Sequence, residues 1–353
     1  MRIIIFFCLI IIVLIRLLTQ THTWREGDLV RISSTVSSEP SIIRNKQKLK
    51  IANLNIFLPI FPQIYYGDYI VIEGEVNGSE LKNPVIRQLK HQTNFLPNFR
   101  NKLLSFYKQA LPEPHSSLVA GIVIGSKENI PFDFWDSLRR TGTLHVVVAS
   151  GMNVTFVATF FLSLFIGFFS RKVAVILAIL GIWLYSSLAG LQAPIIRAAI
   201  MGTISFGAQI FGKVYSALNA LIITLFLMIL VDPQIIGDLG FILTFGATLG
   251  LIIFESRIND KLKFVPMIFR QGLASSLAAQ IVVLPIIFYY FRSFNILSPL
   301  INALVLWTIP IIILIGSVAG VVGVLLPPLG KIILLLAYPM TWWFTMIIDL
   351  MSN

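Results

Sequence analysis

The sequence carries little charge and almost no cysteine. Asp, Glu, Lys and Arg make up 12% of its 353 residues and hydrophobic residues 56%, whereas an average soluble domain has about 25% charged residues. So little charge excludes an ordinary soluble protein and predicts a polytopic α-helical membrane protein. The single cysteine, Cys8, excludes an intrachain disulfide and a thiolate metal cluster.

Motifs for metals and nucleotides are also missing. All four histidines lie in the first 145 residues without HExxH or HxHxD spacing, so we predict no metal site, no metallohydrolase domain and no cofactor. Residues 207–214, GAQIFGKV, fit the GxxxxGK part of a phosphate loop, but Val214 stands where Ser or Thr would bind Mg²⁺. This run ends an apolar segment and follows no strand, so energy for any transport must come from elsewhere.

Basic residues outnumber acidic ones, which gives a formal net charge of +11. In a membrane protein, Lys and Arg first set the orientation and contact anionic headgroups. An anionic lipid bilayer is therefore an expected partner, and basicity alone is weak support for nucleic-acid binding.

The first apolar run is short for a membrane crossing. Thirteen apolar residues, Ile3–Ile15, lie between Arg2 and Arg16, and no small-x-small cleavage pattern follows them. Residues 1–18 are therefore predicted to form an uncleaved transmembrane anchor.

Residues 19–92 predict a small antiparallel β-barrel outside the bilayer. They contain charges of both signs and short alternating runs, with turn signals between them; the runs lie at 27–36, 48–60 and 67–76. A set of basic residues alternates within this region, so that in a strand they would share one face: Arg44, Lys46, Lys48 and Lys50. Two interpretations stay open, a surface that binds single-stranded nucleic acid and a solvated strand face.

Residues 93–117 predict an amphipathic helix in the membrane interface. Its apolar face comprises Phe95, Phe99, Leu103, Phe106 and Tyr107, and its polar residues, which include Arg100 and Lys102, fall mostly on the other side. The remaining residues, 118–353, form a predicted transmembrane domain, which the resemblance given below makes a channel domain.

Long apolar runs recur in the channel domain. They lie at 144–169, 173–191, 194–211, 214–231, 239–254, 272–291, 298–326 and 330–349. With the anchor they predict about nine crossings, since a helix needs about 20 apolar residues to span the hydrocarbon core. Pro310 interrupts one run, which favours two half-helices there.

The charged connections indicate the orientation. Basic-rich connections follow the second, fourth and sixth crossings, at Arg171–Lys172, Lys213 and 255–270, while Asp232 and Asp238 lie between the fifth and sixth. The positive-inside rule then places the N-terminus in the cytoplasm and the β-domain outside.

Polar residues interrupt the run that begins TLHVVVASGMNVTF, residues 143–156. Ser150 and Gly151 break the helical pattern, and His145 and Asn153 lie beside them, as expected for a segment that lines a watery or protein-enclosed cavity. Close helix packing through Ser and Gly is the alternative. His145 lies about 140° around a helix from Ser150, so we expect no catalytic serine and no enzyme.

Four further polar residues lie within or beside apolar runs. A cation at membrane depth costs on the order of 3 kcal/mol, so Arg197 is predicted to be functional, with snorkelling to the interface as the alternative. Asp232 is predicted to cap the entry to a helix with regularly spaced glycines, Gly240, Gly246 and Gly250. Gln280 and Asn302 are, taken singly, more typical of interhelical hydrogen bonds than of ligands.

Four stretches together carry a resemblance. They are RRTGTLHVVVASGMNV, LQAPIIRAA, DPQIIGDLGFILTFGATLGL and QIVVLPIIFYYFRSFNILSPLINAL, at 139–154, 191–199, 232–251 and 280–304. In this order, behind a β-domain similar to an OB-like domain, they resemble the ComEC competence family, inner-membrane channels that take up transforming DNA as a single strand. The resemblance extends over nearly the whole chain.

The resemblance implies a channel path and a set of partners. The implied path residues are His145, Ser150, Gly151, Asn153, Arg197, Gln280 and Asn302. The implied partners are single-stranded DNA, a separate DNA receptor, a cytosolic DNA-pulling ATPase and, as an open possibility, further copies of the chain.

This sequence departs from the family pattern in three respects. Asn153 stands where the family commonly has His, and Thr244 replaces a serine. Full-length members usually continue into a metallo-β-lactamase-like domain, so we expect a short form that relies on a separate nuclease. The alternatives are a transporter of small solutes or lipid precursors and, less favoured, an intramembrane hydrolase that uses Ser150.

Overall fold

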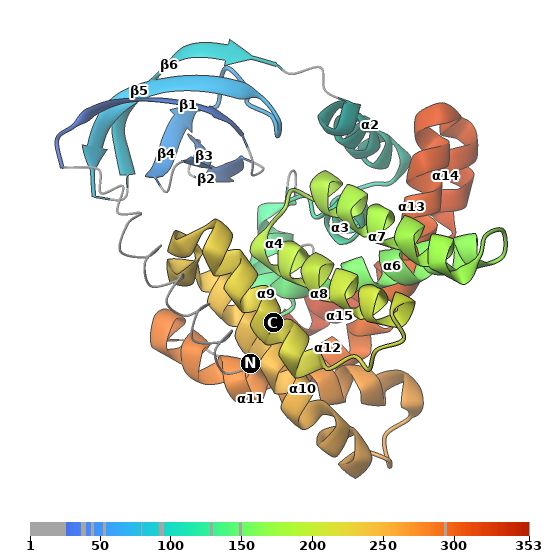
Figure 1. The fold of residues 1–353 in the computed structure, drawn as a ribbon. Coiled ribbons are helices and arrows are strands. Elements are labelled where there is room, and N and C mark those ends of the chain that lie inside the picture. The colour runs from blue at the N-terminus through green and yellow to red at the C-terminus, as the bar shows by residue number, and fades with distance from the viewer. Residues whose placement is uncertain are drawn as a thin grey trace.

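The fold is that of a computed structural model with a β-sheet at one end and a helical part beside it (Figure 1). The structure describes residues 26–36, 40–43, 46–51, 54–78, 80–91, 95–127, 130–147, 150–292 and 295–352. The predicted anchor over residues 1–18 and the predicted DNA contact Arg44 lie outside these ranges.

The six described strands form one open sheet. They are β1 Leu29–Thr35, β2 Ser41–Ile43, β3 Lys46–Ile51, β4 Leu54–Pro59, β5 Tyr69–Asn77 and β6 Glu80–Lys90. Their order is β1-β5-β6-β4-β3-β2, with every pairing antiparallel except β4 with β6. The edge strands β1 and β2 do not pair with each other in this sheet, so the expected closed, OB-like barrel is not confirmed.

Alternating side chains give the sheet one buried face. In β4, Leu54, Ile56 and Leu58 are buried, while Phe57 and Pro59 lie on the outer side. This period of two is the one that half-buried strands require. The expected strand-like runs at 27–36 and 67–76 correspond to β1 and β5, and the run at 48–60 folds into the β3–β4 hairpin.

Two helices connect the sheet to the rest of the chain: α2, Phe95–Ala110, and α3, His115–Ile124. Every residue of α3 is buried, and the helix contacts α2, α5, α13 and α15. The apolar face of α2, with Leu103, Phe106 and Tyr107, packs into this protein core; the expected position of the helix in the membrane interface stays a prediction. Arg100, expected with the polar residues of α2, is instead only 2% exposed.

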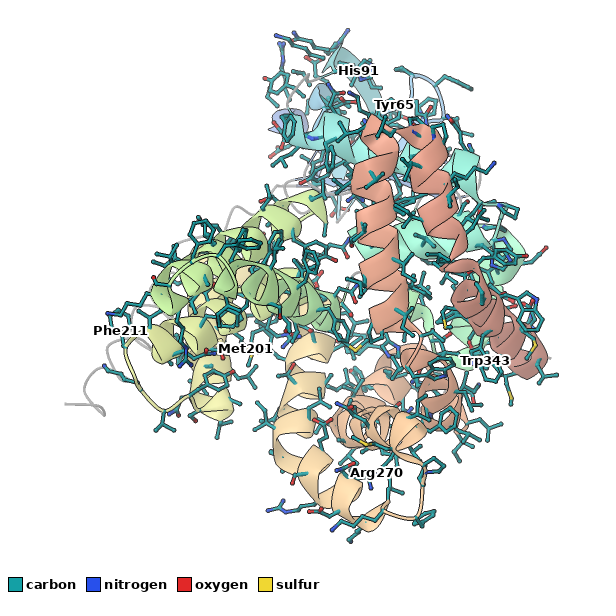
Figure 2. The ribbon with its side chains drawn as sticks, turned by 90° about the vertical axis from the view of Figure 1, so that its right-hand side faces the viewer. Tyr65, His91, Met201, Phe211, Arg270 and Trp343 are labelled. Atoms are coloured by element: carbon teal, nitrogen blue, oxygen red, sulfur yellow. The ribbon has the colours of Figure 1, made fainter. Side chains whose placement is uncertain are left out.

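The remaining helices fall largely within the apolar runs, apart from α4, which precedes the first apolar run of this domain. They are α4 Phe132–Thr141, α5 Leu144–Val147, α6 Gly151–Ile166, α7 Arg171–Leu188, α8 Ala193–Ile210, α9 Ala217–Val231, α10 Leu239–Lys261, α11 Met267–Phe291, α12 Ser298–Leu306, α13 Ile309–Leu325, α14 Pro327–Leu335 and α15 Tyr338–Ser352, with a 3₁₀ turn η1 over Pro233–Gly237. Figure 2 shows Tyr65 and His91 of the β-domain at one end and Arg270, near the start of α11, at the other.

The described helices support five to seven membrane spans, whereas eight crossings are expected once the anchor, which lies outside the described residues, is set aside. Five are long and apolar enough to cross a membrane, and two bent pairs raise the number to seven. One pair, α12 with α13, bends by 45°, which fits the half-helices expected near Pro310. The other, α14 with α15, bends by 52°; we did not predict this break, although Pro339 stands beside it. The expected span at 214–231 forms the shorter helix α9.

Arg100 lies where the β-domain meets two helix ends. Its Nη1 donates to the carbonyl oxygen of Ile124 at 2.7 Å and to that of Leu188, the last residues of α3 and α7. Carbonyls in the last turn of a helix have no intrahelical partner and lie at the negative end of the helix dipole. A buried guanidinium therefore satisfies both helix ends at once.

Tyr66 extends this contact into the β-domain. The Arg100 guanidinium lies over the Tyr66 ring, 5.5 Å from its centroid, and the Tyr66 hydroxyl donates to Ser187 O at 3.1 Å. Burial raises the pKa of Tyr66, although the Arg100 charge opposes that shift, so the hydroxyl stays protonated as a donor. Beside it, Gly67 has φ +90°, and a Cβ there would lie 2.6 Å from Cγ of Pro97.

We expect Arg100→Met to lower the apparent Tm of the full chain. Two buried carbonyls would lose a donor, at about 1–3 kcal/mol for each group left unsatisfied. Thermal unfolding in dodecyl maltoside, followed by tryptophan fluorescence, measures this change. Lys102→Met alters an exposed residue of the same helix and should match the wild type; equal loss in both variants would contradict the assignment.

Candidate functional site

The apolar run from Leu144 is broken where Ser150 and Gly151 stand. Helix α5 ends at Val147 and α6 begins at Gly151, with Ser150 extended at φ −111° and ψ 163°. The break expected from the Ser-Gly pair is therefore present. The Ser150 side chain does not cap α6, so the first amides of this helix receive no side-chain acceptor.

Asn153 ties the start of α6 to the end of α3. Its side chain is fully buried, and its Nδ2 donates to Ile122 O at 2.7 Å. Its Oδ1 accepts from Ser150 Oγ at 3.0 Å. Both Asn153 and Ser150 thus serve as positioning residues for the helix break, and the serine hydroxyl is directed at an amide.

Gly151 allows a close approach between α6 and α8. A Cβ on Gly151 would lie 2.5 Å from Nη2 of Arg197 and 3.3 Å from Cβ of Ala198. Because the first distance is shorter than real Cβ contacts, any larger residue would displace the guanidinium. The absence of a side chain at position 151 therefore places Arg197 against the helix break.

Thr244 of α10 holds the other side of Arg197. Arg197 Nε donates to Thr244 Oγ1 at 2.9 Å, and Nη1 contacts the sulfur of Met201 at 3.6 Å. Thr244 is buried and Arg197 is partly buried. Three sequence stretches, which contribute Gly151, Arg197 and Thr244, meet at this point; we call these three residues the Arg197 site.

The Arg197 site contains no carboxylate. Among the described residues no acidic side chain forms an ion pair with Arg197, and the sequence has no Asp or Glu between Asp136 and Asp232. Within the described part of the chain, the guanidinium is neutralised by no side chain.

The other predicted path residues lie apart from these contacts. His145 is exposed, and its Nδ1 lies 3.0 Å from Gly142 O. Gln280, on α11, is partly exposed. Asn302 is buried in a separate polar cluster, where its Nδ2 donates to Ser276 Oγ at 2.9 Å. Thr244, which sequence reasoning did not select, had one signal: a hydroxyl residue also stands there in the family pattern.

Two aspartates cap the helices around the 3₁₀ turn. Asp232 Oδ1 accepts from Gln234 N at 3.1 Å and so caps η1. Asp238 Oδ1 accepts from Phe241 N at 2.9 Å and caps the glycine-spaced helix α10. The cap of the glycine-spaced helix is therefore Asp238 and not, as the sequence leads us to expect, Asp232, which caps the 3₁₀ turn η1.

A second candidate surface lies on the outer face of β3 and β4. Lys46 pairs in register with Pro59, and Lys48 with Phe57, whose ring centroid lies 5.7 Å from Lys48 Nζ. Lys50 continues β3 opposite Asn55, but its side chain lies outside the described residues.

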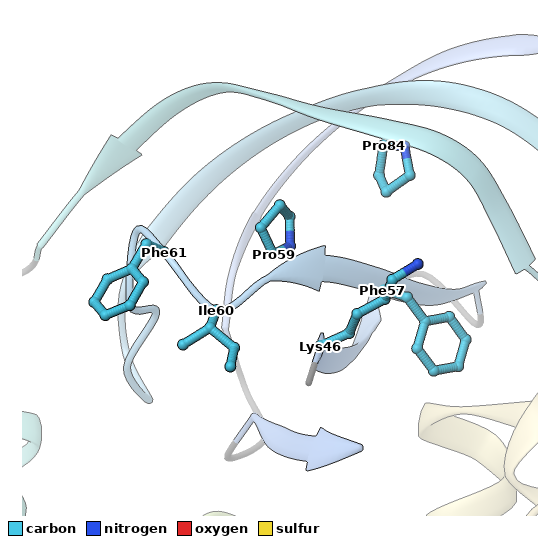
Figure 3. Close-up of a pocket in the computed structure, with 6 residues that line it drawn as sticks. All are labelled: Lys46, Phe57, Pro59, Ile60, Phe61 and Pro84. Atoms are coloured by element: carbon cyan, nitrogen blue, oxygen red, sulfur yellow. The ribbon is translucent and has the colours of Figure 1, made fainter. Parts of the chain in front are cut away.

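An open pocket lies on this face (Figure 3). Its lining comprises Lys46, Phe57, Pro59, Ile60, Phe61 and Pro84. Phe61 is 80% exposed. The buried amide of Gln47 fixes the adjoining loop, since Nε2 donates to the carbonyls of Pro59, Ile60 and Pro62 at 2.7–2.9 Å. We call these lysines and aromatic residues, Lys46, Lys48, Phe57 and Phe61, the basic face.

Neither surface resembles a metal centre. Among the described residues, no group of three or more His, Cys, Asp or Glu side chains is placed to hold a metal ion. Both surfaces instead present cations, with hydroxyls at one and aromatic rings at the other, which is chemistry that suits an anionic ligand.

Comparison with known proteins identifies the family. The pattern of the Competence protein family matches residues 122–353, about two thirds of the chain, and includes every member of the Arg197 site. The chain belongs to the Competence protein family. Over 227 residues this competence-family chain is 29% identical to ComE operon protein 3 of Bacillus subtilis (strain 168), which confirms the resemblance to the ComEC family.

The aligned part is 64% of this competence-family chain but only 28% of the Bacillus subtilis protein. The chain therefore spans little more than a quarter of that relative. No solved structure matches this competence-family chain.

We expect Asn153→Ala to destabilise the protein and Asn153→His to do so less. Alanine leaves the buried Ile122 carbonyl without a donor, at about 1–3 kcal/mol, whereas an imidazole N–H replaces the lost donor. Apparent Tm values of the full chain in dodecyl maltoside test this order. Asn219→Ala, at an exposed amide, is the control, and an Asn153→Ala variant as stable as this control would contradict the assigned role.

Proposed function

We propose that this competence-family protein is a multi-pass channel subunit that takes up transforming DNA as a single strand across the cytoplasmic membrane. The observation that carries the proposal is the basic face, where Lys46 and Lys48 lie beside the partly exposed Phe57 on the outer side of β3 and β4, and the exposed Phe61 follows in the loop after β4. Family membership supports the same function.

The chemistry of the basic face fits a single strand. Lys46 and Lys48 offer charges to the phosphates, and Phe57 and Phe61 offer ring surfaces to the bases. Proteins that bind single strands without sequence preference combine these two contacts. A duplex would present phosphates but no free base faces, so the rings favour a single strand.

The helical part supports transport. Five to seven apolar helices suit a membrane protein, and the Arg197 site offers a polyanion a cation within them. We place the N-terminus in the cytoplasm and the β-domain outside, where it would meet the strand first. A separate DNA receptor, a cytosolic DNA-pulling ATPase and a separate nuclease are the partners that this role requires.

Two alternatives have less support. A transporter of small solutes or lipid precursors would use the helices but leaves the basic face without a role. A hydrolase would need a base that activates Ser150. The Ser150 hydroxyl instead donates a hydrogen bond to the Asn153 amide oxygen, and an amide oxygen is not such a base. We therefore propose a non-enzymatic role.

We expect removal of the basic face to weaken binding of single-stranded DNA. Lys46→Gln with Lys48→Gln should make the slope of log affinity against log salt shallower by about 1.4, at about 0.7 per phosphate contact. Phe61→Ala should cost about 1–3 kcal/mol through lost stacking. Fluorescence anisotropy of a labelled oligonucleotide with the full chain in nanodiscs measures both effects.

The control for this experiment removes the same charge elsewhere. Lys102→Gln with Lys108→Gln changes two exposed residues of α2. If this pair alters the salt slope as much as the basic-face pair, the attraction is general and the proposed surface is wrong.

Uptake in cells tests the function itself. A strain that lacks this gene should fail to internalise labelled DNA, and the wild-type gene should restore uptake. We expect the variant with Lys46→Gln, Lys48→Gln and Phe61→Ala to restore it poorly at equal protein levels. Normal uptake in the deletion strain would remove DNA transport from the protein's functions.

A further inference from the structure

The Arg197 guanidinium has unused hydrogen-bond donors. A guanidinium carries five N–H groups; Arg197 uses one on Thr244 and one on the Met201 sulfur. Three N–H groups therefore lack an acceptor within the described part of the chain. A cation at membrane depth is costly unless water or a ligand supplies acceptors, and the buried unpartnered atoms of the described residues include none from Arg197, so these donors are accessible to such a group.

The surrounding backbone also contributes positive electrostatic potential around Arg197. Arg197 lies in the second turn of α8, whose N-cap residue, Gln192, makes no side-chain cap. Nη2 lies against Gly151, at the equally uncapped start of α6. Because the N-terminus of a helix carries partial positive charge, both helix starts reinforce the guanidinium and favour an anion.

We propose that Arg197, held by Gly151 and Thr244 and supported by the starts of α6 and α8, binds a phosphodiester monoanion. A guanidinium fork matches two oxygens of one phosphate, and among the described residues no carboxylate pairs with Arg197. Ser150, Gly151 and Arg197 are each partly exposed, so a ligand reaches them. This proposal extends the proposed function. It rests on that function only in taking a DNA strand as the source of the phosphodiester.

Dimethyl phosphate is the probe, because it carries the phosphodiester without bases or lipid chains. With the full chain in dodecyl maltoside, which contains no phosphate, ³¹P line broadening should report binding. We expect Arg197→Gln to weaken it about tenfold or more. Gly151→Ala should weaken it severalfold, since the new methyl group displaces Nη2. Arg171→Gln, at the exposed start of α7, should bind as the wild type does.

Controls separate binding from folding. Each variant is compared at matched apparent Tm and elution volume, and Arg197→Lys keeps the charge but loses the fork, so it should bind more weakly than the wild type. If the folded Arg197→Gln variant binds dimethyl phosphate as the wild type does, or if the wild type does not bind it, the site is wrong.

A second arm identifies the source of the phosphodiester. The measurement is repeated in nanodiscs that contain phosphatidylglycerol. Retained binding of dimethyl phosphate indicates a ligand from solution, such as a strand, whereas its loss indicates that lipid headgroups fill the site.

The outcome is independent of the uptake experiment. Binding that depends on Arg197, combined with normal uptake in the deletion strain, would keep the phosphodiester site and overturn DNA transport. If binding of dimethyl phosphate does not depend on Arg197 and the deletion strain loses DNA uptake, DNA transport would stand and the phosphodiester site would be wrong.

Discussion

The buried charge of Arg100 is the contact on which the rest of the arrangement depends. It satisfies the last carbonyls of α3 and α7 and lies over Tyr66 of the β-domain. Two residues before its α3 acceptor, Ile122 O accepts from Asn153, so one helix end receives two side-chain donors. Because Asn153 fixes the start of α6, the position of Gly151, and with it that of Arg197, follows from the end of α3.

The two arginines, Arg100 and Arg197, thus have different roles in the helical part. Arg100 has carbonyl partners from two helix ends and serves the fold, in keeping with the rule that buried charges must be hydrogen-bonded. Among the described residues, Arg197 contacts the Thr244 hydroxyl and the Met201 sulfur but no carboxylate. Its charge therefore adds little to stability and much to the local positive potential. The difference in partners separates a structural cation from one that is available to a ligand.

Sequence patterns predicted what depends on local periodicity. The apolar runs predicted the positions of the helices, and Ser150-Gly151 predicted the break, because both features depend only on residues that are neighbours in the sequence. The burial of Arg100 was not predictable from the pattern of α2, since its acceptors lie 24 and 88 positions away. The openness of the sheet likewise depends on pairing between strands that are distant in the sequence. The bend between α14 and α15 has a local signal, since Pro339 is the second residue of α15. Thr244 became a site residue only when α10 was placed beside α8.

The distribution of acidic residues bears on selectivity as much as the position of Arg197 does. No Asp or Glu occurs between Asp136 and Asp232, or between Asp238 and Glu255, so α6 to α9 and most of α10 contain none. A single cation attracts any anion, but a carboxylate nearby would pair with it and repel a phosphate. A path for a polyanion needs both features, because each phosphate must be attracted without meeting a fixed negative charge. These helices provide both.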